Sequence, residues 1–555
     1  MLKKYGLPAI ITVIVSAINF YITLPAINPK SSTFWGFLIF AVVVYFVSMG
    51  LIGKSLHLIN LLKGVPSDKV VFDFKGKSDS KRRKVLKRVV LIVGAIVIAV
   101  FGVIFATSAK VFNASEYQQM LTVTESNFNE DIAELPLSQI PVVDRSTAER
   151  LGSRKIGEVV DLVSQFNVSS YYTQINYNDT PVRVSPLEYA DLIKWFTNKD
   201  GGIPYYVKID MATQDTELVK LTNGMKYAPC EYFSRDLMRH VRFTYPTQMI
   251  DSVSFEIDES GAPYWIVSCY DYTIGILGGY DITAIITVNA VDGTMNYYDV
   301  DSVPQWIDCV YKADVVLNQA NYWGAYKNGY FNSLISQKNV VKTTEGYNYL
   351  AINDDIWVYT GITSVVADES NIGFLLVNLR TKEAKTYAIN GAEEYSAMES
   401  AEGKIQEKGY TATFPILVNI ADTPSYFISL KDSAGLVKAY SFVSVANYQI
   451  VGVADTVADA ESEYRRLLKE SGKLNENTPS SKTETITGIV SAITSAVVNG
   501  NTCYYIRLGS SDAIYIANVS LNDALPFVKV GDPVTITIDT NGDKAVVTAV
   551  NLSNQ

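Results

Sequence analysis

Residues that could act as nucleophiles, proton carriers or soft metal ligands are scarce in this sequence. The 555-residue chain holds two histidines, His57 and His240, and four cysteines. It has no Gly-x-Ser-x-Gly elbow, His-Glu-x-x-His pair, Cys-x-x-Cys pair or phosphate-binding glycine loop. A serine or cysteine hydrolase site beyond residue 108 would need His240, and a lone helical histidine is more often structural. The sequence therefore predicts no catalytic residue, no cofactor and no metal site.

Carboxylate chemistry stays open as an alternative, because acidic residues occur in pairs. The two pairs are Asp299 with Asp301 and Asp354 with Asp355. Two carboxyl groups facing each other across a cleft could hydrolyse a glycosidic bond or bind a cation. A further acidic loop, Asp539 to Asp543, matches part of a calcium loop, but it also contains the Asn-Gly pair of a hairpin turn. Acidic residues near strand ends more often form turns, which is the role we expect here.

Aromatic and basic side chains are the candidates for recognising a partner. Trp265 and Trp357 lie in aromatic-rich segments and could stack on a sugar or pack against a protein. Cross-strand packing is nevertheless the commoner role of a single aromatic residue in a sheet. Arg145, Arg150 and Arg154 form a dense basic cluster that could contact an acidic partner or lipid head groups, unless it is a solvated helix face. These five residues are our candidate partner-binding residues.

Three apolar runs near the N-terminus must position everything that follows them. They are residues 8–27, 34–53 and 89–107, and none contains a charged side chain. Each is close to the roughly 20 residues that a helix needs to cross about 30 Å of hydrocarbon. We therefore expect residues 1–107 to be a membrane anchor of three transmembrane helices, with a basic loop at residues 54–88.

Charge predicts the orientation of this anchor. Residues 1–107 hold 14 Lys and Arg against three Asp, and most of these basic residues lie in the loop at 54–88. Of the 47 basic and 57 acidic residues in the chain, 33 and 54 remain for residues 108–555, a net charge of −21. The positive-inside rule places the N-terminus and the basic loop in the cytoplasm and residues 108–555 outside. Such an acidic exterior disfavours nucleic acid as a partner, whereas the lipid bilayer is an expected one.

The exterior part is expected to have an α+β fold. In its first segment, residues 108–203, helical spacing predicts a helix from Ile156 to Phe166, and Tyr171 to Val184 predict a hairpin. Ser185 to Glu188 then match a capping box, so we expect a helix to begin there. The apolar face that this helix would bury consists of Tyr189, Leu192, Ile193 and Phe196.

Residues 204–472 repeat one pattern, an aromatic-bearing strand followed by further strands and often by a helix. Three copies run over residues 263–300, 355–389 and 424–453. From about residue 230 to 470 the pattern resembles the PepSY-type modules of bacterial cell-envelope proteins. The matching residues are Tyr264, Trp265, Val288, Asp292, Gly293 and Tyr297. The resemblance implies an inhibitory, sensing or assembly role outside the cytoplasm rather than catalysis.

A polar linker, residues 473–483, precedes a small β domain at residues 484–555. Its five predicted strands, a short helix near residues 521–527 and the segment Val528–Ile536 resemble an OB-fold barrel. Many OB-folds bind oligonucleotides or sugars, but fold alone does not give function. The few basic residues of this segment disfavour nucleic acid here as well.

Taken together, these features favour a non-catalytic bacterial membrane protein that binds a protein partner in the cell envelope. Two alternatives stay open: a cell-wall hydrolase that uses paired carboxylates, and a subunit of a membrane transport complex. The apolar runs lack the ionisable groups that ion and proton pathways usually contain. Cys269 and Cys309, which lie in one β-rich segment, could form a disulfide or remain free thiols.

The charge asymmetry generates a testable topology. Protease added to intact protoplasts should degrade residues 108–555 and spare the basic loop, because the membrane shields the cytoplasmic side. Antibodies against a tag at each position would report the two fates. Digestion of the loop with survival of the exterior part would contradict the orientation.

Overall fold

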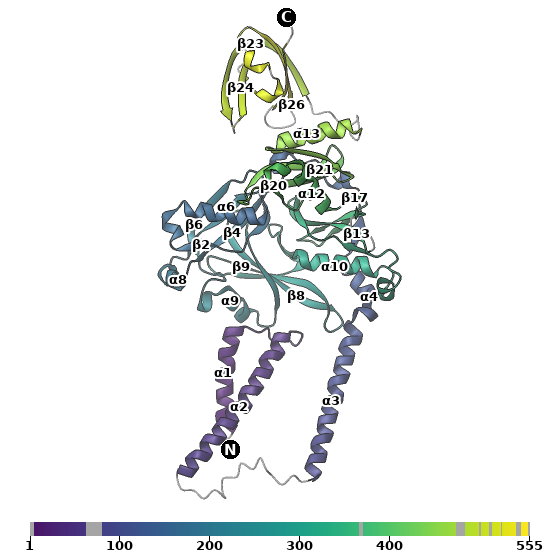
Figure 1. Ribbon diagram of the computed structural model, residues 1–555. Helices are drawn as coiled ribbons and strands as arrows, with labels where there is room; N and C mark the ends of the chain where they lie inside the picture. The colour runs from purple at the N-terminus through teal and green to yellow at the C-terminus, as the bar shows by residue number, and fades with distance from the viewer. Residues whose placement is uncertain are drawn as a thin grey trace. The chain divides into compact units, whose positions relative to one another are not determined.

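The computed structural model describes residues 5–62, 80–365, 370–472, 483–498, 501–509, 513–522, 524–539 and 546–552. It is a mixed α+β protein in which antiparallel sheets alternate with helices (Figure 1). The chain divides into two compact units. Unit 1 comprises Met1–Ile420 and Pro424–Tyr464, and unit 2 comprises Ala421–Thr423 and Arg465–Gln555.

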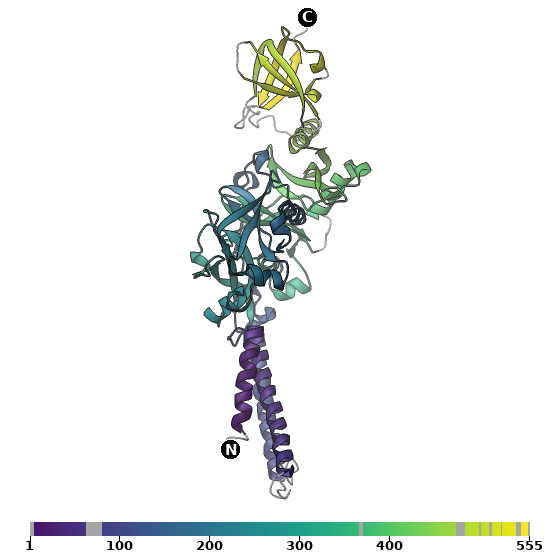
Figure 2. The ribbon, with the colours of Figure 1, turned by 90° about the vertical axis from the view of Figure 1, so that its left-hand side faces the viewer.

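Unit 1 begins with three apolar helices. They are α1 (Leu7–Thr23), α2 (Ser32–Leu62) and α3 (Ser80–Ser108). Two apolar segments, Ser32–Ile52 and Gly94–Gln118, are long and apolar enough to span a membrane, whereas α1 has 17 residues. Helices α2 and α3 extend into both ends of the expected basic loop, and residues 63–79 of that loop lie outside the described residues. All three helices leave the rest of unit 1 on the same side (Figures 1 and 2).

The remainder of unit 1 repeats a helix followed by an antiparallel sheet. The helices that precede successive sheets are α6 (Arg145–Gly157), α9 (Leu237–Thr244), α10 (Ala313–Tyr326) with α11 (Tyr330–Leu334), and α12 (Glu394–Lys404). Within the described residues this helix-and-sheet repeat therefore occurs four times. The other helices between α3 and the second sheet are α4 (Lys110–Gln118), α5 (Phe128–Asp131), α7 (Val160–Val163) and α8 (Leu192–Asn198).

The first two sheets are formed by residues 166–225 and 249–299. The first sheet contains β2 (Phe166–Val168), β3 (Thr173–Tyr177), β4 (Thr180–Tyr189), β5 (Ile203–Asp210) and β6 (Thr216–Met225), in the order β2-β4-β5-β6 with β3 also paired to β4. The second is the meander β7 (Met249–Ile257), β8 (Pro263–Ile274), β9 (Gly278–Asn289) and β10 (Met295–Asp299). Their β strands are consecutive in sequence, so short turns connect most of the neighbours.

The third and fourth sheets follow the same plan. The third contains β11 (Val341–Thr343), β12 (Asn348–Ile352), β13 (Asp355–Ser364), β15 (Gly373–Asn378) and β16 (Ala384–Tyr387), and β1 (Val123–Glu125) pairs with β16 in parallel. The fourth contains β18 (Thr411–Ala412), β19 (Ile416–Ile420), β20 (Thr423–Lys431), β21 (Val437–Ser444) and β22 (Asn447–Ala454). A two-stranded pair is formed by β14 (Ser370–Asn371) and β17 (Gly391–Ala392). The three predicted strand repeats, at 263–300, 355–389 and 424–453, are confirmed.

Helix α13 (Val457–Glu470) begins at a capping box formed by Thr456 and Asp459. The Thr456 hydroxyl donates to the Asp459 carboxylate over 2.7 Å, and the Asp459 amide donates back to Thr456 Oγ1 over 3.1 Å. This reciprocal bonding satisfies donors that have no partner within the helix. Tyr464 and Leu468, four positions apart on one face of the helix, are buried.

Two helices predicted in the first segment are confirmed only in part: the helix expected to begin at Ser185 begins at Leu192 as α8, and the helix expected from Ile156 to Phe166 is interrupted. Ser185 to Tyr189 belong to strand β4, where Ser185 pairs with Val207 and Pro186 with Tyr206, so tertiary pairing overrides the local capping-box pattern. The stretch from Ile156 to Phe166 is broken into the end of α6, the short α7 and strand β2. The hairpin predicted from Tyr171 to Val184 is confirmed as β3–β4.

The described residues of unit 2 form five strands in the order β25-β24-β23-β26-β27. They are β23 (Thr483–Val498), β24 (Asn501–Leu508), β25 (Tyr515–Asn518), β26 (Pro533–Asp539) and β27 (Val546–Leu552), with 3₁₀ turns at Val519–Leu521 and Leu525–Phe527. Their own apolar core includes Val490, Ile506, Val534 and Ile536. The acidic loop proposed to resemble a calcium site lies largely outside the described residues, which end at Asp539 and resume at Val546.

The interior of unit 1 holds two carboxyl groups beside each other. Glu256 of β7 accepts hydrogen bonds from the Asp308 amide over 3.0 Å and the Cys309 amide over 3.2 Å. Asp308 in turn accepts from the Asn176 amide over 2.7 Å. Burial raises the pKa of Glu256 to about 7, and burial with the neighbouring Glu256 raises the pKa of Asp308 well above its usual range.

Glu256 makes stability fall as the pH rises. The unfolded chain releases this proton near pH 4.5 and the folded protein near pH 7, so ionisation favours unfolding across that window by about 3 kcal/mol. The variant Glu256→Gln cannot titrate. In detergent, the unfolding free energy of the variant minus that of wild type should therefore increase by about 3 kcal/mol between pH 4.5 and pH 7.5. If the two proteins differed in unfolding free energy by the same amount at both pH values, the raised pKa of Glu256 would be contradicted.

Candidate functional site

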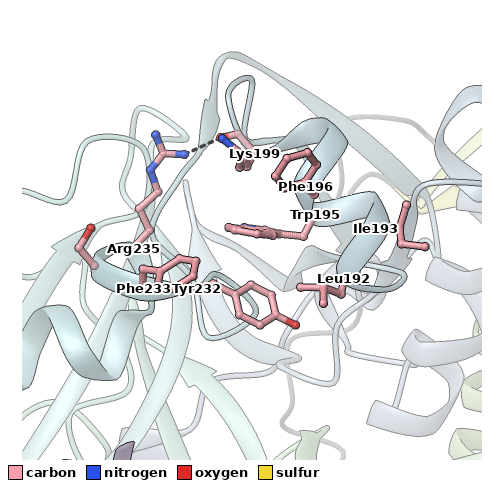
Figure 3. Close-up of a pocket in the computed structure, with 9 residues that line it drawn as sticks. Leu192, Ile193, Trp195, Phe196, Lys199, Tyr232, Phe233 and Arg235 are labelled. Atoms are coloured by element: carbon pink, nitrogen blue, oxygen red, sulfur yellow. Dashed lines mark hydrogen bonds between the residues drawn. The ribbon is translucent and has the colours of Figure 1, made fainter. Parts of the chain in front are cut away.

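An apolar hollow of about 870 Å³ lies between helix α8 and the 3₁₀ turn η4 (Phe233–Arg235). We call it the α8–η4 groove (Figure 3). Its lining residues are Leu192, Ile193, Trp195, Phe196, Lys199, Tyr232, Phe233, Ser234 and Arg235. Binding sites for small molecules and peptide segments have volumes of this order and similarly apolar walls.

Helix α8 forms because its first turn is capped. The Asp191 carboxylate accepts from the Lys194 amide over 2.9 Å, which satisfies one of the free donors at the helix start. The helix ends before Gly202, whose φ of 75° lies in the left-handed region. A Cβ at Gly202 would also meet the Met225 carbonyl at 2.5 Å, so glycine is required there on both grounds.

The apolar face of α8 is exposed rather than buried. The prediction that Leu192, Ile193 and Phe196 enter a core is wrong, since their side chains are 56%, 71% and 67% exposed. Trp195 and Tyr189 are buried, as Tyr189 was expected to be. A cluster of exposed large apolar side chains is uncommon on a soluble surface and usually marks an interaction site.

A buried carboxylate holds the floor of the groove in place. Glu231 accepts from Trp195 Nε1 over 2.7 Å and from the Tyr189 hydroxyl over 2.8 Å, and it is itself buried. Burial raises the pKa of Glu231, although these two hydrogen bonds act in the opposite direction. Because each oxygen of this carboxylate accepts one of the two hydrogen bonds, the Trp195 indole is held at a fixed position relative to the end of β4.

The other wall of the groove presents aromatic rings from a strained turn. Phe233 has φ 56°, a left-handed conformation that is unusual for a bulky side chain, and its ring is 66% exposed. The Trp195 ring centroid lies 4.6 Å from that of Tyr232 and 6.1 Å from that of Phe233. Strain of this kind persists where the surroundings enforce it and is frequent at binding sites.

Two cations lie at one end of the groove. Arg235 Nη1 donates to the Lys199 carbonyl over 2.5 Å, which joins η4 to the end of α8 (Figure 3). The Lys199 ammonium lies 5.6 Å from the Phe196 ring centroid. The groove therefore combines an apolar floor with a basic end, although residues 108–555 are strongly acidic as a whole.

The structure separates the candidate partner-binding residues from this groove. Trp265 and Trp357 are buried in sheets, where the Trp265 indole donates to the Tyr227 carbonyl over 2.8 Å, in agreement with the packing role preferred for single aromatic residues. Arg145, Arg150 and Arg154 are exposed on α6. The guanidinium groups of Arg145 and Arg150 donate to the carbonyls of Ser170 and Ala434, so they also join neighbouring segments.

The paired carboxylates have local roles. Asp355 binds the Arg380 guanidinium over 2.5 Å, and Asp354, with φ 65°, sits in the turn between β12 and β13 and accepts from Asn176 over 3.1 Å. Asp299 ends β10, and Asp301 lies in the 3₁₀ turn that follows. Within the residues that the structure describes, no three His, Cys, Asp or Glu side chains are grouped so that they could hold a metal ion.

The histidine and the cysteines also have structural surroundings. His240 Nε2 lies 2.8 Å from the Gly293 carbonyl, and its ring is 4.6 Å from that of Tyr227. All four cysteines are free thiols, and Cys269 is fully buried. The open question of a Cys269–Cys309 bond is therefore answered in favour of free thiols.

Comparisons with known proteins leave the family open. No family model matches the chain, and no curated protein matches it. Among solved structures, a levansucrase mutant from B. megaterium aligns at TM-score 0.19 and 10% identity over 78% of this chain and 97% of that one. An apocarotenoid oxygenase from Synechocystis aligns at 0.14 and 9%, over 69% and 62%, and a polysaccharide lyase at 0.15 and 9%, over 69% and 76%. Similarity this low supports neither a shared fold nor a shared role.

The bracing of the groove can be tested with one substitution. In Glu231→Gln an amide nitrogen replaces one acceptor, so Trp195 or Tyr189 loses its partner and the unfolding free energy should fall by about 1–3 kcal/mol. The exposed Glu259→Gln is the matched control and should change stability by less than about 0.5 kcal/mol. Chemical unfolding followed by tryptophan fluorescence measures both. Equal stabilities would show that Glu231 does not brace the groove.

Proposed function

We propose that the protein is a non-catalytic, multi-pass protein of a bacterial cell membrane that binds a protein partner in the cell envelope. The observation that carries this proposal is the α8–η4 groove, an apolar, solvent-open hollow held by buried hydrogen bonds. In this proposal the N-terminus is cytoplasmic, α1, α2 and α3 cross the membrane, and residues 108–555 face the outside.

The anchor proposal is supported by composition and by exposure. The apolar windows of α2 and α3 have a mean hydropathy of 2.3 and 2.2, and few of their residues are buried within the protein. Such surfaces are stable against lipid and unfavourable in water. Helix α1 has 17 residues, the lower end of the spanning range.

The chemistry of the groove indicates the kind of protein segment that would fit it. Aromatic rings at the floor and on one wall favour aliphatic or aromatic anchors, because such pockets form the energetic centre of many interfaces. Lys199 and Arg235 at one end favour an acidic residue beside those anchors. We therefore propose a partner that presents an apolar segment next to a carboxylate.

Two finer features of the fold belong to the same proposal. The helix-and-sheet units of residues 204–472 would be PepSY-like modules, a comparison supported by their antiparallel meanders and preceding helices. Unit 2 would be an OB-like barrel, supported by five antiparallel strands and by the close approach of β25 to β27 at the two ends of the strand order.

A photocrosslinker at Tyr232, in the groove, tests the function in native membranes. The expected result is a discrete adduct with one protein, identified by mass spectrometry, whose affinity is then measured with purified components. Phe196→Ser should weaken binding by about tenfold or more, because it removes an anchor from the groove. Phe331→Ser is the matched control: its ring is 66% exposed against 67% for Phe196, it lies on α11, and it should change affinity by less than about twofold. Equal effects of the two variants would refute the groove as the binding site.

A further inference from the structure

The ends of the apolar helices are bonded to the folded part of unit 1. The segment after α1 joins the turn after α9: the Ile27 amide donates to the Pro246 carbonyl over 2.7 Å, and Asn28 Nδ2 donates to the Thr247 carbonyl over 3.2 Å. Lys30 forms an ion pair with Asp271 of β8 over 2.8 Å. These bonds place α9 next to the C-terminal end of α1 (Figure 1) and hold Lys30, in the loop between α1 and α2, beside β8.

The end of α3 is held in a similar way by the β8–β9 hairpin. Ser108 Oγ accepts from the Ile276 and Leu277 amides over 3.1 and 3.0 Å, and the Ser108 carbonyl accepts from the Tyr117 hydroxyl over 2.8 Å. Gly275 has φ 57°, and a Cβ there would collide with the Thr107 carbonyl. The hairpin therefore approaches the last turn of α3 as closely as backbone allows.

Exposed apolar side chains gather at these two junctions. The Phe243 ring of α9 lies 5.8 Å from Phe20 and 6.2 Å from Tyr21, both in the last turn of α1. The Phe112 ring of α4 lies 5.9 Å from Phe105 in the last turns of α3. We call Phe112, Phe243, Ile276 and Leu277 the apolar rim; all four side chains are exposed.

We propose that the apolar rim inserts into the interfacial layer of the outer leaflet, so that the folded part of unit 1 rests on the membrane. The inference rests on the proposed crossing of the membrane by α1–α3. Three separate elements contribute to the rim, and each meets a spanning helix where that helix would leave the hydrocarbon. At this depth aromatic and aliphatic side chains gain free energy by leaving water while neighbouring polar groups stay hydrated.

The apolar rim contacts lipid because the ends of α1 and α3 fix its depth in the bilayer. A side chain that contacts the last turn of a spanning helix meets head groups and upper acyl chains in any bilayer that the helix crosses. The polar groups near the rim also suit the interfacial layer. Arg239 donates to the Tyr21 carbonyl over 3.3 Å, and its guanidinium lies 4.2 Å from the Tyr21 ring. Arginine and tyrosine are typical of the interfacial layer.

The test uses single-cysteine additions to the full-length protein in lipid nanodiscs without any partner protein. Phe243→Cys and Leu277→Cys report on the rim, Val160→Cys on an exposed site of α7, and Val43→Cys on the middle of α2. Each carries an environment-sensitive fluorophore, and wild type processed in parallel gives the background from the native cysteines. Lipids with a quenching nitroxide near the head group or near the chain end probe the two depths. Thermal melting verifies that each variant is folded.

The expected result is quenching of both rim positions by the shallow nitroxide, by about twofold or more over Val160→Cys, with Val43→Cys quenched by the deep one. Quenching at Val43→Cys with rim positions no more quenched than Val160→Cys would overturn the insertion of the rim while leaving the anchor intact. Absence of quenching at Val43→Cys would overturn the spanning helices themselves, and the insertion with them.

Discussion

The arrangement of unit 1 depends on one buried arginine. Arg242 of α9 is 5% exposed, and its guanidinium donates to the carbonyls of Leu24, Pro246 and Gln248 over 3.0, 3.2 and 2.6 Å. Leu24 follows α1, whereas the other two carbonyls belong to the turn between α9 and β7. A planar guanidinium has five donors in a fixed geometry, whereas a lysine ammonium has three on a freely rotating group. Burial lowers the pKa of Arg242, and this desolvation is tolerated because the group is so fully bonded.

This constraint links the C-terminal end of α1 to the proposed binding site. Helix α9 follows η4 directly, and the Asp236 carboxylate caps α9 by accepting from the Arg239 amide over 2.8 Å. Phe233 of η4 belongs to the groove wall, and Arg239 Nη1 donates to its carbonyl over 2.7 Å. A short run of hydrogen-bonded residues therefore connects the end of α1 to the groove. Rigid positioning lowers the entropic cost of binding a partner that is held in the same membrane.

The sequence predicted those parts of the fold in which local and tertiary preferences agree. Aromatic and β-branched residues with tight turns predicted the strand meanders, because the chemistry of these features is local. Ser185 to Glu188 show the opposite case, since pairing with β5 outweighs a capping-box pattern in the same residues.

The α8–η4 groove was not predicted from the sequence, for a related reason. Leu192, Ile193 and Phe196 have the spacing of a buried helix face, and nothing in the spacing tells which face has no covering element. Two local signals pointed to it in hindsight: Asp191 as a cap, and adjacent Tyr232 and Phe233 in a short polar segment. The partner of Trp195, Glu231, lies 36 positions away in sequence, and such a contact is visible only in the folded protein.

The folded part of unit 1 is bonded to the C-terminal ends of the apolar helices α1 and α3. Pulsed electron paramagnetic resonance between spin labels at Ser32→Cys, where α2 begins, and Asp200→Cys, just after α8, measures this directly in nanodiscs. A single narrow distance distribution is expected, and it should broaden when Arg242→Gln removes the guanidinium. A broad distribution in the protein with Arg242 intact would show that the groove moves freely relative to these helices, which would contradict the fixed arrangement.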